Sequence, residues 1–387
     1  MEYRELKERE RNGRIPSGCG VSGIMNRNGN VFSGDGILES ICSMTERGNG
    51  LGSGYAGYGI YPECADNWCL HVMYDAPGAK EFSEEYLETV FDIVHEEPIP
   101  VKKVETLKYV PFLHRYFMNL KSGRSHELSA DEDRVIKAAM HINRNFEGAC
   151  VFSSGKNMGI FKGVGNPDEI GEFYGIGNYK GYIWTAHNRF PTNTVGWWGG
   201  AHPFGILDWS VVHNGEISSY GINRRYLENA GYYCSFFTDT EVITYLFDML
   251  YRKHDLDFEV IADILAAPLW SDIDSENDPR RKEFLTALRM IYSSALINGP
   301  FAIIVANSGA MVGLNDRVKL RPLVAAESGE FVYLASEESA IRLICKNPGR
   351  VWMPEAGQPV IARINNSPPL FPSSCPSPQR VEGRMEE

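Results

Sequence analysis

Four short segments of the chain contain side chains that could take part in chemistry. They are Cys19-Gly20-Val21, His187-Asn188-Arg189-Phe190-Pro191-Thr192, His213-Asn214-Gly215-Glu216-Ile217 and Thr238-Asp239-Thr240-Glu241-Val242-Ile243. A cysteine thiol is a strong nucleophile once it is deprotonated. An arginine presents a planar fork that can bond both oxygens of a carboxylate. Together the segments offer a nucleophile, a cation, an amide and a carboxylate, which are groups that a hydrolytic site uses.

Taken one at a time, these residues have ordinary structural explanations. Cysteine is commonly buried and inert in a strand, and an arginine such as Arg189 usually lies at the surface or in an ion pair. Asn214-Gly215 is a favoured turn dipeptide, and Asp239 suits the cap of a helix. Only their joint occurrence, in this order along one chain, favours a functional site over these interpretations.

The order and spacing of the four segments resemble the class-II glutamine amidotransferases, whose glutaminase domain has an N-terminal-nucleophile fold. Within that group the chain is most similar to the glutaminase domain of glutamate synthases. The similar strings are Arg189-Phe190-Pro191-Thr192-Asn193-Thr194, Trp197-Trp198, Ala201-His202-Pro203-Phe204, His213-Asn214-Gly215-Glu216-Ile217, Gly313-Leu314, Leu320-Arg321-Pro322-Leu323 and Leu334-Ala335-Ser336-Glu337. The resemblance covers roughly residues 19–75 and 180–364, and four ordered motifs make it highly specific.

The resemblance makes Cys19 the nucleophile that forms a γ-glutamyl thioester, with loss of ammonia and then hydrolysis to glutamate. The base in this chemistry is the α-amine of the nucleophile itself, whose reference pKa of about 7.7–8.0 suits neutral pH. An internal Cys19 has no free amine. Residues 1–18 are therefore expected to be a pro-segment that is removed by self-cleavage after Gly18, or else an N-terminal extension.

The resemblance also implies how the substrate is bound. Asn214 would supply a side-chain N–H and Gly215 a backbone N–H to the oxyanion, and one such donor contributes roughly 2.7–4 kcal/mol in a preorganised site. Arg189 suits the α-carboxylate of glutamine and Asp239 suits its α-ammonium. Two further residues of the same motifs are expected to contact the substrate, namely Thr192 and His213.

The fold implied by the resemblance is an α+β, four-layer αββα sandwich of the N-terminal-nucleophile hydrolase type, spanning residues 19–364. Sheet-on-sheet packing agrees with the many short strands. Apolar patterning predicts strands at 19–25, 68–74, 181–186, 209–212, 301–306, 331–335 and 360–364, and helices at 37–44, 239–254 and 337–345. Residues 82–147 are expected to form an α/β insertion with a second helix from Ser129, and the Pro/Ser-rich tail 365–387 to be disordered.

The composition is that of a globular protein that can bury a core. The 387 residues are 43% hydrophobic and 23% charged, with a formal net charge of −12. No basic stripe points to nucleic acid, and no apolar run approaches the ~18 residues of a membrane span. Residues 1–18 have no apolar core and do not form a secretory signal. The eight cysteines show no disulfide framework, which indicates reduced thiols and a cytoplasmic location.

The partners follow from the resemblance. L-glutamine is the expected substrate, and the ammonia is expected to pass to a separate synthase subunit, since the chain ends soon after the glutaminase region. A glutamate synthase would add it to 2-oxoglutarate with a flavin on the partner, while this chain would hold no cofactor. The alternatives are a synthase for another acceptor, such as an N-substituted glutamate, and a non-catalytic glutamine-binding subunit. The sequence does not decide whether the chain forms a homo-oligomer. The Arg189 and Asp239 pair disfavours a hydrolase for other amides.

Two other patterns are weaker. Residues 52–57 satisfy G-x-G-x-x-G, but they lack the preceding parallel strand and acidic residue of a dinucleotide site. Cys64, Cys69 and His71 lie near one another in sequence, but no second ligand pair follows at zinc spacing. The sequence therefore predicts neither a nucleotide site nor a metal site.

Overall fold

The computed structural model describes residues 18–121, 128–191 and 196–365; the side chains of 128 and 129 are not described. Three predictions fall outside these ranges: the pro-segment up to residue 17, the proposed contact of Thr192 with the substrate, and the disordered tail from residue 366. The seven cysteines within the described ranges are free thiols. Across the same ranges, no helix combines the length and apolarity that crossing a membrane requires.

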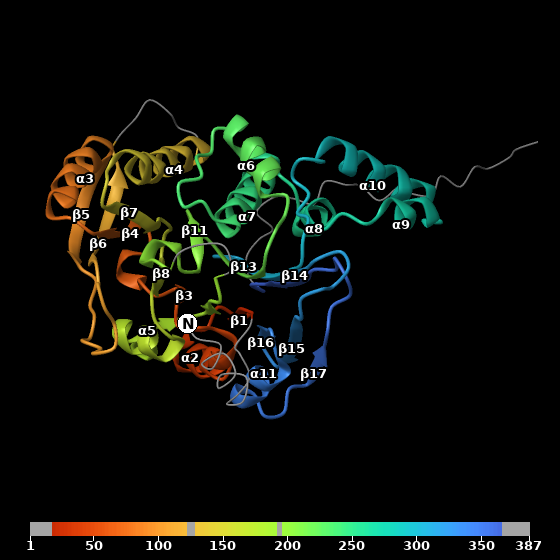
Figure 1. Ribbon diagram of the computed structural model, residues 1–387, viewed down its shortest axis with the longest axis horizontal. Helices are drawn as coiled ribbons and strands as arrows, with labels where there is room; N and C mark the ends of the chain where they lie inside the picture. Colours follow the sequence, from red (N-terminus) through yellow and green to blue (C-terminus); the bar gives the residue numbers. More distant parts are fainter. Residues whose placement is uncertain (1–17, 122–127, 192–195, 366–387) are drawn as a thin grey trace, which may run out of the picture.

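Two antiparallel sheets stack at the centre of the molecule (Figure 1). The larger sheet has the order β17 (Arg350–Trp352), β15 (Val324–Ser328), β16 (Phe331–Ala335), β1 (Gly20–Asn26), β10 (Ile183–Asn188), β3 (Ser53–Tyr58), β8 (Met158–Gly163). The smaller sheet has the order β11 (Phe204–Ile206), β12 (Trp209–Gly215), β13 (Phe301–Asn307), β14 (Ala310–Asn315), β18 (Val360–Arg363). Their inner faces meet so closely that a Cβ on Gly23 of β1 would lie 2.8 Å from Met311 Sδ of β14.

Helices cover the outer face of each sheet, which confirms the four-layer αββα sandwich of the α+β class (Figure 1). Against the larger sheet lie α2 (Asp35–Cys42), α5 (Pro167–Tyr174) and α11 (Glu338–Ile344). On the side of the smaller sheet lie α6 (Tyr220–Asn229), α7 (Asp239–Asp248) and α8 (Phe258–Leu265), followed by α9 (Trp270–Ser275) and α10 (Pro279–Ile291). The strands β2 (Phe32–Ser33) and β9 (Lys180–Gly181) form a short separate pair.

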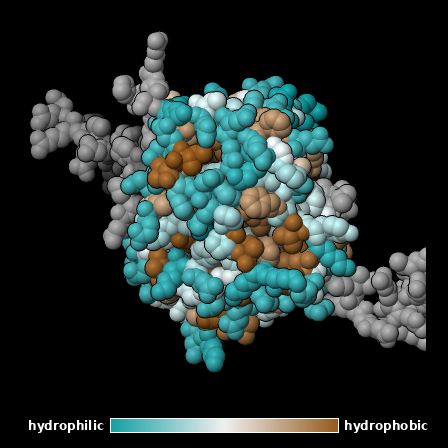
Figure 2. Space-filling view, turned by 90° about the vertical axis from the view of Figure 1, so that its left-hand side faces the viewer, coloured by the Kyte–Doolittle hydropathy of each residue, from teal (hydrophilic) through white to brown (hydrophobic). Residues whose placement is uncertain are grey.

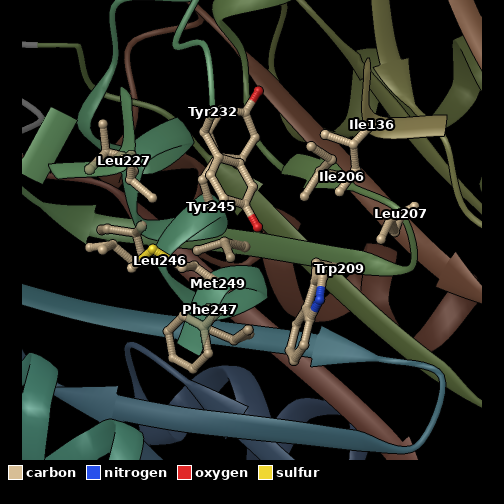
Figure 3. Packing of buried hydrophobic residues seen from close by; sticks show 14 of the residues in the cluster. Ile136, Ile206, Leu207, Trp209, Leu227, Tyr232, Tyr245, Leu246, Phe247 and Met249 are labelled. Atoms are coloured by element: carbon tan, nitrogen blue, oxygen red, sulfur yellow. The ribbon is translucent and has the colours of Figure 1, made fainter. Parts of the chain in front are cut away.

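A third, four-stranded sheet and the two helices packed on it contain most of the predicted insertion and lie at the upper left of Figure 1. Its order is β5 (Phe91–Pro98), β6 (Phe112–Leu120), β4 (Trp68–Tyr74), β7 (Ala149–Ser153), and its helices are α3 (Pro77–Val90) and α4 (Leu128–Asn145). We call residues 68–153 the α/β lobe. Ile136 of α4 packs beside Ile206 and Leu207 in the same apolar cluster as α7 (Figure 3). The lobe therefore shares a core with the α7 side of the sandwich.

Each strand and helix predicted by apolar patterning has an observed counterpart, but several observed elements were not predicted, among them β8, β14, β15, α5, α6 and α10. Two further differences concern the ends and types of the elements. The predicted helix at 239–254 is α-helical up to Asp248 and continues as one π-helical turn over Met249–Lys253. The glycine-rich run at 48–59, for which no element was predicted, contains β3, a fully buried strand of the larger sheet. The G-x-G-x-x-G pattern at 52–57 thus lies mainly within a strand.

Candidate active site

Cys19 directly precedes β1, in the middle of the larger sheet. Its Sγ accepts a hydrogen bond from the Phe190 N–H at 3.3 Å, and its carbonyl oxygen accepts one from Arg47 Nε at 2.9 Å. Arg47 in turn pairs with Glu337 at 2.8 Å. Burial raises the pKa of the Cys19 thiol, although the Phe190 amide and the nearby charges of Arg189 and Arg321 oppose this. Cys19 is therefore held by its backbone and its sulfur, and its thiol is protonated at neutral pH.

The pairing of β1 with β10 brings Arg189 to the nucleophile. Gly20 is the register partner of Asn188, the last residue of β10. The residue that follows, Arg189, therefore lies beside Cys19 although 170 positions separate them in the sequence. The Arg189 N–H donates to Gly52 O at 2.9 Å, and a Cβ on Gly52 would lie 3.2 Å from Arg189 Cδ. Glycine at 52 therefore leaves room for the arginine side chain.

The second sheet contributes the end of β12. Asn214 is completely buried, and neither amide atom of its side chain has a hydrogen-bond partner among the described residues. Gly215 has φ +148°, and a Cβ there would lie 2.0 Å from Pro300 O. Only glycine fits this backbone and this close approach. The Asn-Gly pair ends a core strand instead of forming the hairpin turn that is common for this dipeptide.

Asp239 is the first residue of α7, behind Thr238 at the helix cap. Its Oδ2 accepts from the Ile217 N–H at 3.1 Å, and its Oδ1 lies 3.6 Å from His213 Nδ1. Burial by itself raises the pKa of Asp239, but His213 and the amides of Ile217 and Thr240 outweigh it, so the pKa lies below its usual value. A helix N-terminus also favours a negative charge. Asp239 is therefore an ionised carboxylate at neutral pH.

These elements enclose one cavity of about 180 Å³ between the two sheets. Five of the predicted site residues line it, namely Cys19, Arg189, His213, Gly215 and Asp239. Asn214 lies next to Gly215 but is not among the lining residues, and Thr192 lies outside the described ranges. The remaining lining residues are Phe190, Pro191, His202, Glu216, Ile217, Tyr220, Phe237 and Thr238.

Several residues at this site were not predicted to act there. The hydrogen bond from the backbone N–H of Phe190 could not be predicted, because a backbone group is not specific to a residue type. His202 and Arg321 belong to strings that resemble glutamate synthases, which was the one signal for them. Tyr220 and Phe237, at the cavity wall, come from the segment between β12 and α7, where the sequence offered no pattern.

No cofactor or metal ligand set emerges at this cavity within the described residues. The His71 ring, considered above with Cys64 and Cys69, lies 2.9 Å from both Ile160 O and Tyr61 Oη, so both nitrogens are engaged. Within the part of the chain that the structure describes, one group could hold a metal: Glu84, Glu96 and His114 in the α/β lobe. There Lys80 pairs with Glu84 and lies 3.9 Å from Glu96, so an ammonium already balances the carboxylates.

One cavity of the αββα sandwich thus brings together a buried thiol, a guanidinium and an ionised carboxylate. This fold and these groups are those of the N-terminal-nucleophile hydrolases. The family model "Glutamine amidotransferases class-II" matches residues 101–239. An uncharacterized protein of Archaeoglobus fulgidus is 50% identical over 351 residues, which cover 90% of this chain and 93% of that one. The chain belongs to the class-II glutamine amidotransferase family.

Longer proteins share part of this similarity. Glutamine–fructose-6-phosphate aminotransferase (isomerizing) of Francisella tularensis is 26% identical over 218 residues, which cover 53% of this chain and 31% of that one. A solved structure of the allosteric regulatory enzyme of purine biosynthesis aligns with a TM-score of 0.45 at 16% identity, covering 89% of this chain and 47% of that chain. The chain thus spans less than half the length of both proteins.

Proposed function

We propose that this chain is the glutaminase component of an amidotransferase, which hydrolyses L-glutamine to glutamate and ammonia through a thioester on Cys19. The observation that supports this best is the convergence of Cys19, Arg189 and Asp239 on one small cavity. A free amino acid carries a carboxylate and an ammonium at one end. A guanidinium and an ionised carboxylate in one cavity match both charges.

In the proposed complex, Arg189 binds the α-carboxylate of glutamine and Asp239 binds its α-ammonium. His213 and Thr192 contact the same end of the substrate. The side-chain amide of glutamine then points to Cys19 Sγ. The buried amide N–H of Asn214 and the N–H of Gly215 donate to the oxygen of the tetrahedral intermediate, and the Asn214 side chain has no other partner among the described residues. Donors that are already in place cost no reorganisation during the reaction.

The thiol needs a base, because burial keeps it protonated. In the proposal, residues 1–18 are removed and the freed α-amine of Cys19 takes the thiol proton as sulfur attacks the amide carbon. The carbon–nitrogen bond breaks, and the proton passes to the departing ammonia. A water molecule then attacks the thioester carbon, giving glutamate and the free thiol. An amine with a pKa near 7.7–8.0 can both accept and return a proton at neutral pH.

We further propose that the ammonia passes to a synthase subunit on a separate chain, most simply one of a glutamate synthase with a bound flavin. The support is the set of strings shared with glutamate synthase glutaminase domains, among them Arg189 to Thr194 and Leu320 to Leu323. Synthases for other acceptors would use the same ammonia. The proposal places the reaction in the cytoplasm, where thiols stay reduced.

The test begins with the intact mass of protein purified from its native host. We expect a chain that starts at Cys19, releases ammonia from L-glutamine and loses this activity in Cys19→Ala. Cys42→Ala is the matched control, because Cys42 is a half-buried thiol whose pKa burial raises to about 12. A full-length chain without glutaminase activity would refute the catalytic proposal and leave a glutamine-binding subunit, which isothermal titration with glutamine would detect.

A further inference from the structure

The hydroxyl of Thr240 meets three functional groups beneath the cavity. Thr240 is the second residue of α7 and is completely buried. Its Oγ1 lies 3.3 Å from Asp239 Oδ1, 3.2 Å from His213 Nδ1 and 3.3 Å from His202 Nε2. Asp239 and the two histidines line the cavity, so the hydroxyl contacts three residues of the cavity lining.

Counting protons fixes the direction of these hydrogen bonds. A hydroxyl has one proton to donate and two lone pairs to accept with. The ionised Asp239 carboxylate can only accept, so Thr240 donates to it. Both imidazoles must then donate to the Thr240 oxygen, His213 through Nδ1–H and His202 through Nε2–H. The remaining ring nitrogens, His213 Nε2 and His202 Nδ1, are buried and have no hydrogen-bond partner among the described residues.

This arrangement orients the carboxylate of Asp239. Its Oδ2 is held by the Ile217 N–H at 3.1 Å, while Oδ1 receives the hydroxyls of Thr240 at 3.3 Å and Thr238 at 3.4 Å. Thr240 differs from Thr238 because two histidines fix the position of its oxygen. A carboxylate held at both oxygens presents its remaining lone pairs in one direction, which pre-organises it for a cation.

We propose that Thr240 is a positioning residue for glutamine binding: together with His202 and His213, it aims the Asp239 carboxylate at the α-ammonium of the substrate. The inference rests on the proposed function and deepens it. Since the hydroxyl does not touch the reacting amide, its loss removes binding that the ground state and the transition state share. Such a loss raises KM and leaves kcat nearly unchanged.

Thr244 provides a matched control one turn further along α7. It is also completely buried, but its hydroxyl donates at 2.8 Å to the backbone oxygen of Thr240 and to no side chain in the described structure. Thr244→Val and Thr240→Val therefore each replace one buried hydroxyl of α7 by a methyl group. Thr240→Ser restores the hydroxyl, and Thr240→Ala is a second deletion if Thr240→Val does not fold.

The experiment compares two reagents that alkylate Cys19 in the mature protein. A diazoketone analogue of L-glutamine carries the amino-acid end, and iodoacetamide does not. For Thr240→Val we expect the analogue to react about ten-fold more slowly at low concentration, the KM for glutamine to rise by a similar factor, and the iodoacetamide rate to stay unchanged. Thr240→Ser and Thr244→Val should behave like the wild type.

The outcomes distinguish a failure of the positioning role of Thr240 from a failure of the proposed function. Equal analogue rates for Thr240→Val and wild type would overturn the positioning role. A parallel loss of the iodoacetamide rate would also overturn it, because the site as a whole would be disturbed. If the wild type itself neither hydrolyses glutamine nor reacts with the analogue, the proposed function is refuted and the inference falls with it.

Discussion

Strands β12 and β5 have similar lengths but opposite surroundings. All but one of the residues of β12 are buried, and the strand pairs with β11 on one side and β13 on the other. In β5 one residue, Phe91, is buried, and the strand lies at the edge of its sheet beside β6. His213 and Gly215, which line the cavity, thus belong to a strand that is fixed on both edges, while the outer strand of the α/β lobe is fixed on one.

The lobe itself has two different sides. Its inner side is bound to α7 and its π-helical turn through Arg252, which contacts both Asp133 of α4 and Asp248 of α7. Figure 2 shows the face of the molecule on the side where the lobe lies, with apolar patches among hydrophilic ones. Phe82 and Tyr109 of the lobe are 63% and 96% exposed. From this comparison we expect substitutions at the cavity to lower the free energy of unfolding most. Substitutions at the inner side of the lobe should lower it less, and a change in the charge of one side chain should have the smallest effect.

The largest effect is expected for Gly215→Ala. The left-handed backbone at φ +148° strains any other residue by ~1–3 kcal/mol. The new Cβ also lies 2.0 Å from Pro300 O, and forcing β12 away from it costs a further ~1–3 kcal/mol or more. We expect the variant to be insoluble or to unfold at much lower urea concentration, as circular dichroism would show.

Gly231→Ala is the matched control for this substitution. Gly231 also has a positive φ, +89°, but no atom lies within 4 Å of a Cβ built on it. Its substitution therefore has the cost of backbone strain without the clash. If the two variants had the same stability, the close approach of β12 to Pro300 would not be what requires glycine at this position.

A smaller but still large effect is expected for Arg252→Met, at the inner side of the lobe. Arg252 bonds both oxygens of the completely buried Asp248, at 2.8 and 2.9 Å, and Tyr232 donates to the same carboxylate. Removing one partner of a buried ion pair typically costs ~3–5 kcal/mol, because the other charge stays buried. Urea denaturation should show a loss in this range.

Arg363→Met tests the same change at an exposed pair. Arg363 and Glu259 are 3.2 Å apart, and both side chains are about half exposed. Exposed pairs contribute ~0–1 kcal/mol, so this variant should stay close to the wild type. Similar losses in both variants would contradict the large cost expected for leaving the buried Asp248 carboxylate without Arg252.

The comparison also explains what the sequence could and could not predict. The order of the motifs predicted which residues would meet, and Cys19, Arg189 and Asp239 do meet. It did not predict β3, because glycine is disfavoured in strands. A Cβ on Gly54 would lie 2.4 Å from His202 O, so the strand needs glycine where other chains approach it. Likewise, the contacts of Thr240 depend on three elements that meet only in the fold.

The smallest effect is expected for Glu132, at the inner side of the lobe, which makes the free energy of unfolding depend on pH. Burial raises the pKa of Glu132, and the carboxylates of Asp208, Asp248 and Asp133 raise it further against the effect of Arg252, to about 7 from 4.5. The folded state therefore binds more protons than the unfolded state between pH 4.5 and 7. Because of this difference, Glu132 makes the free energy of unfolding fall as the pH rises through that window.

Glu132→Gln should remove this part of the pH dependence, because the amide does not titrate. Glu132 is a quarter exposed, so solvent screens the effect, and we expect the variant to be more stable by on the order of 1 kcal/mol at pH 8 and little changed at pH 4. Urea denaturation at both pH values measures this, with the exposed Glu85→Gln on α3 as the control. A variant that is less stable than the wild type at pH 8 would show that the ion pair of Glu132 with Arg252 outweighs the burial of its charge.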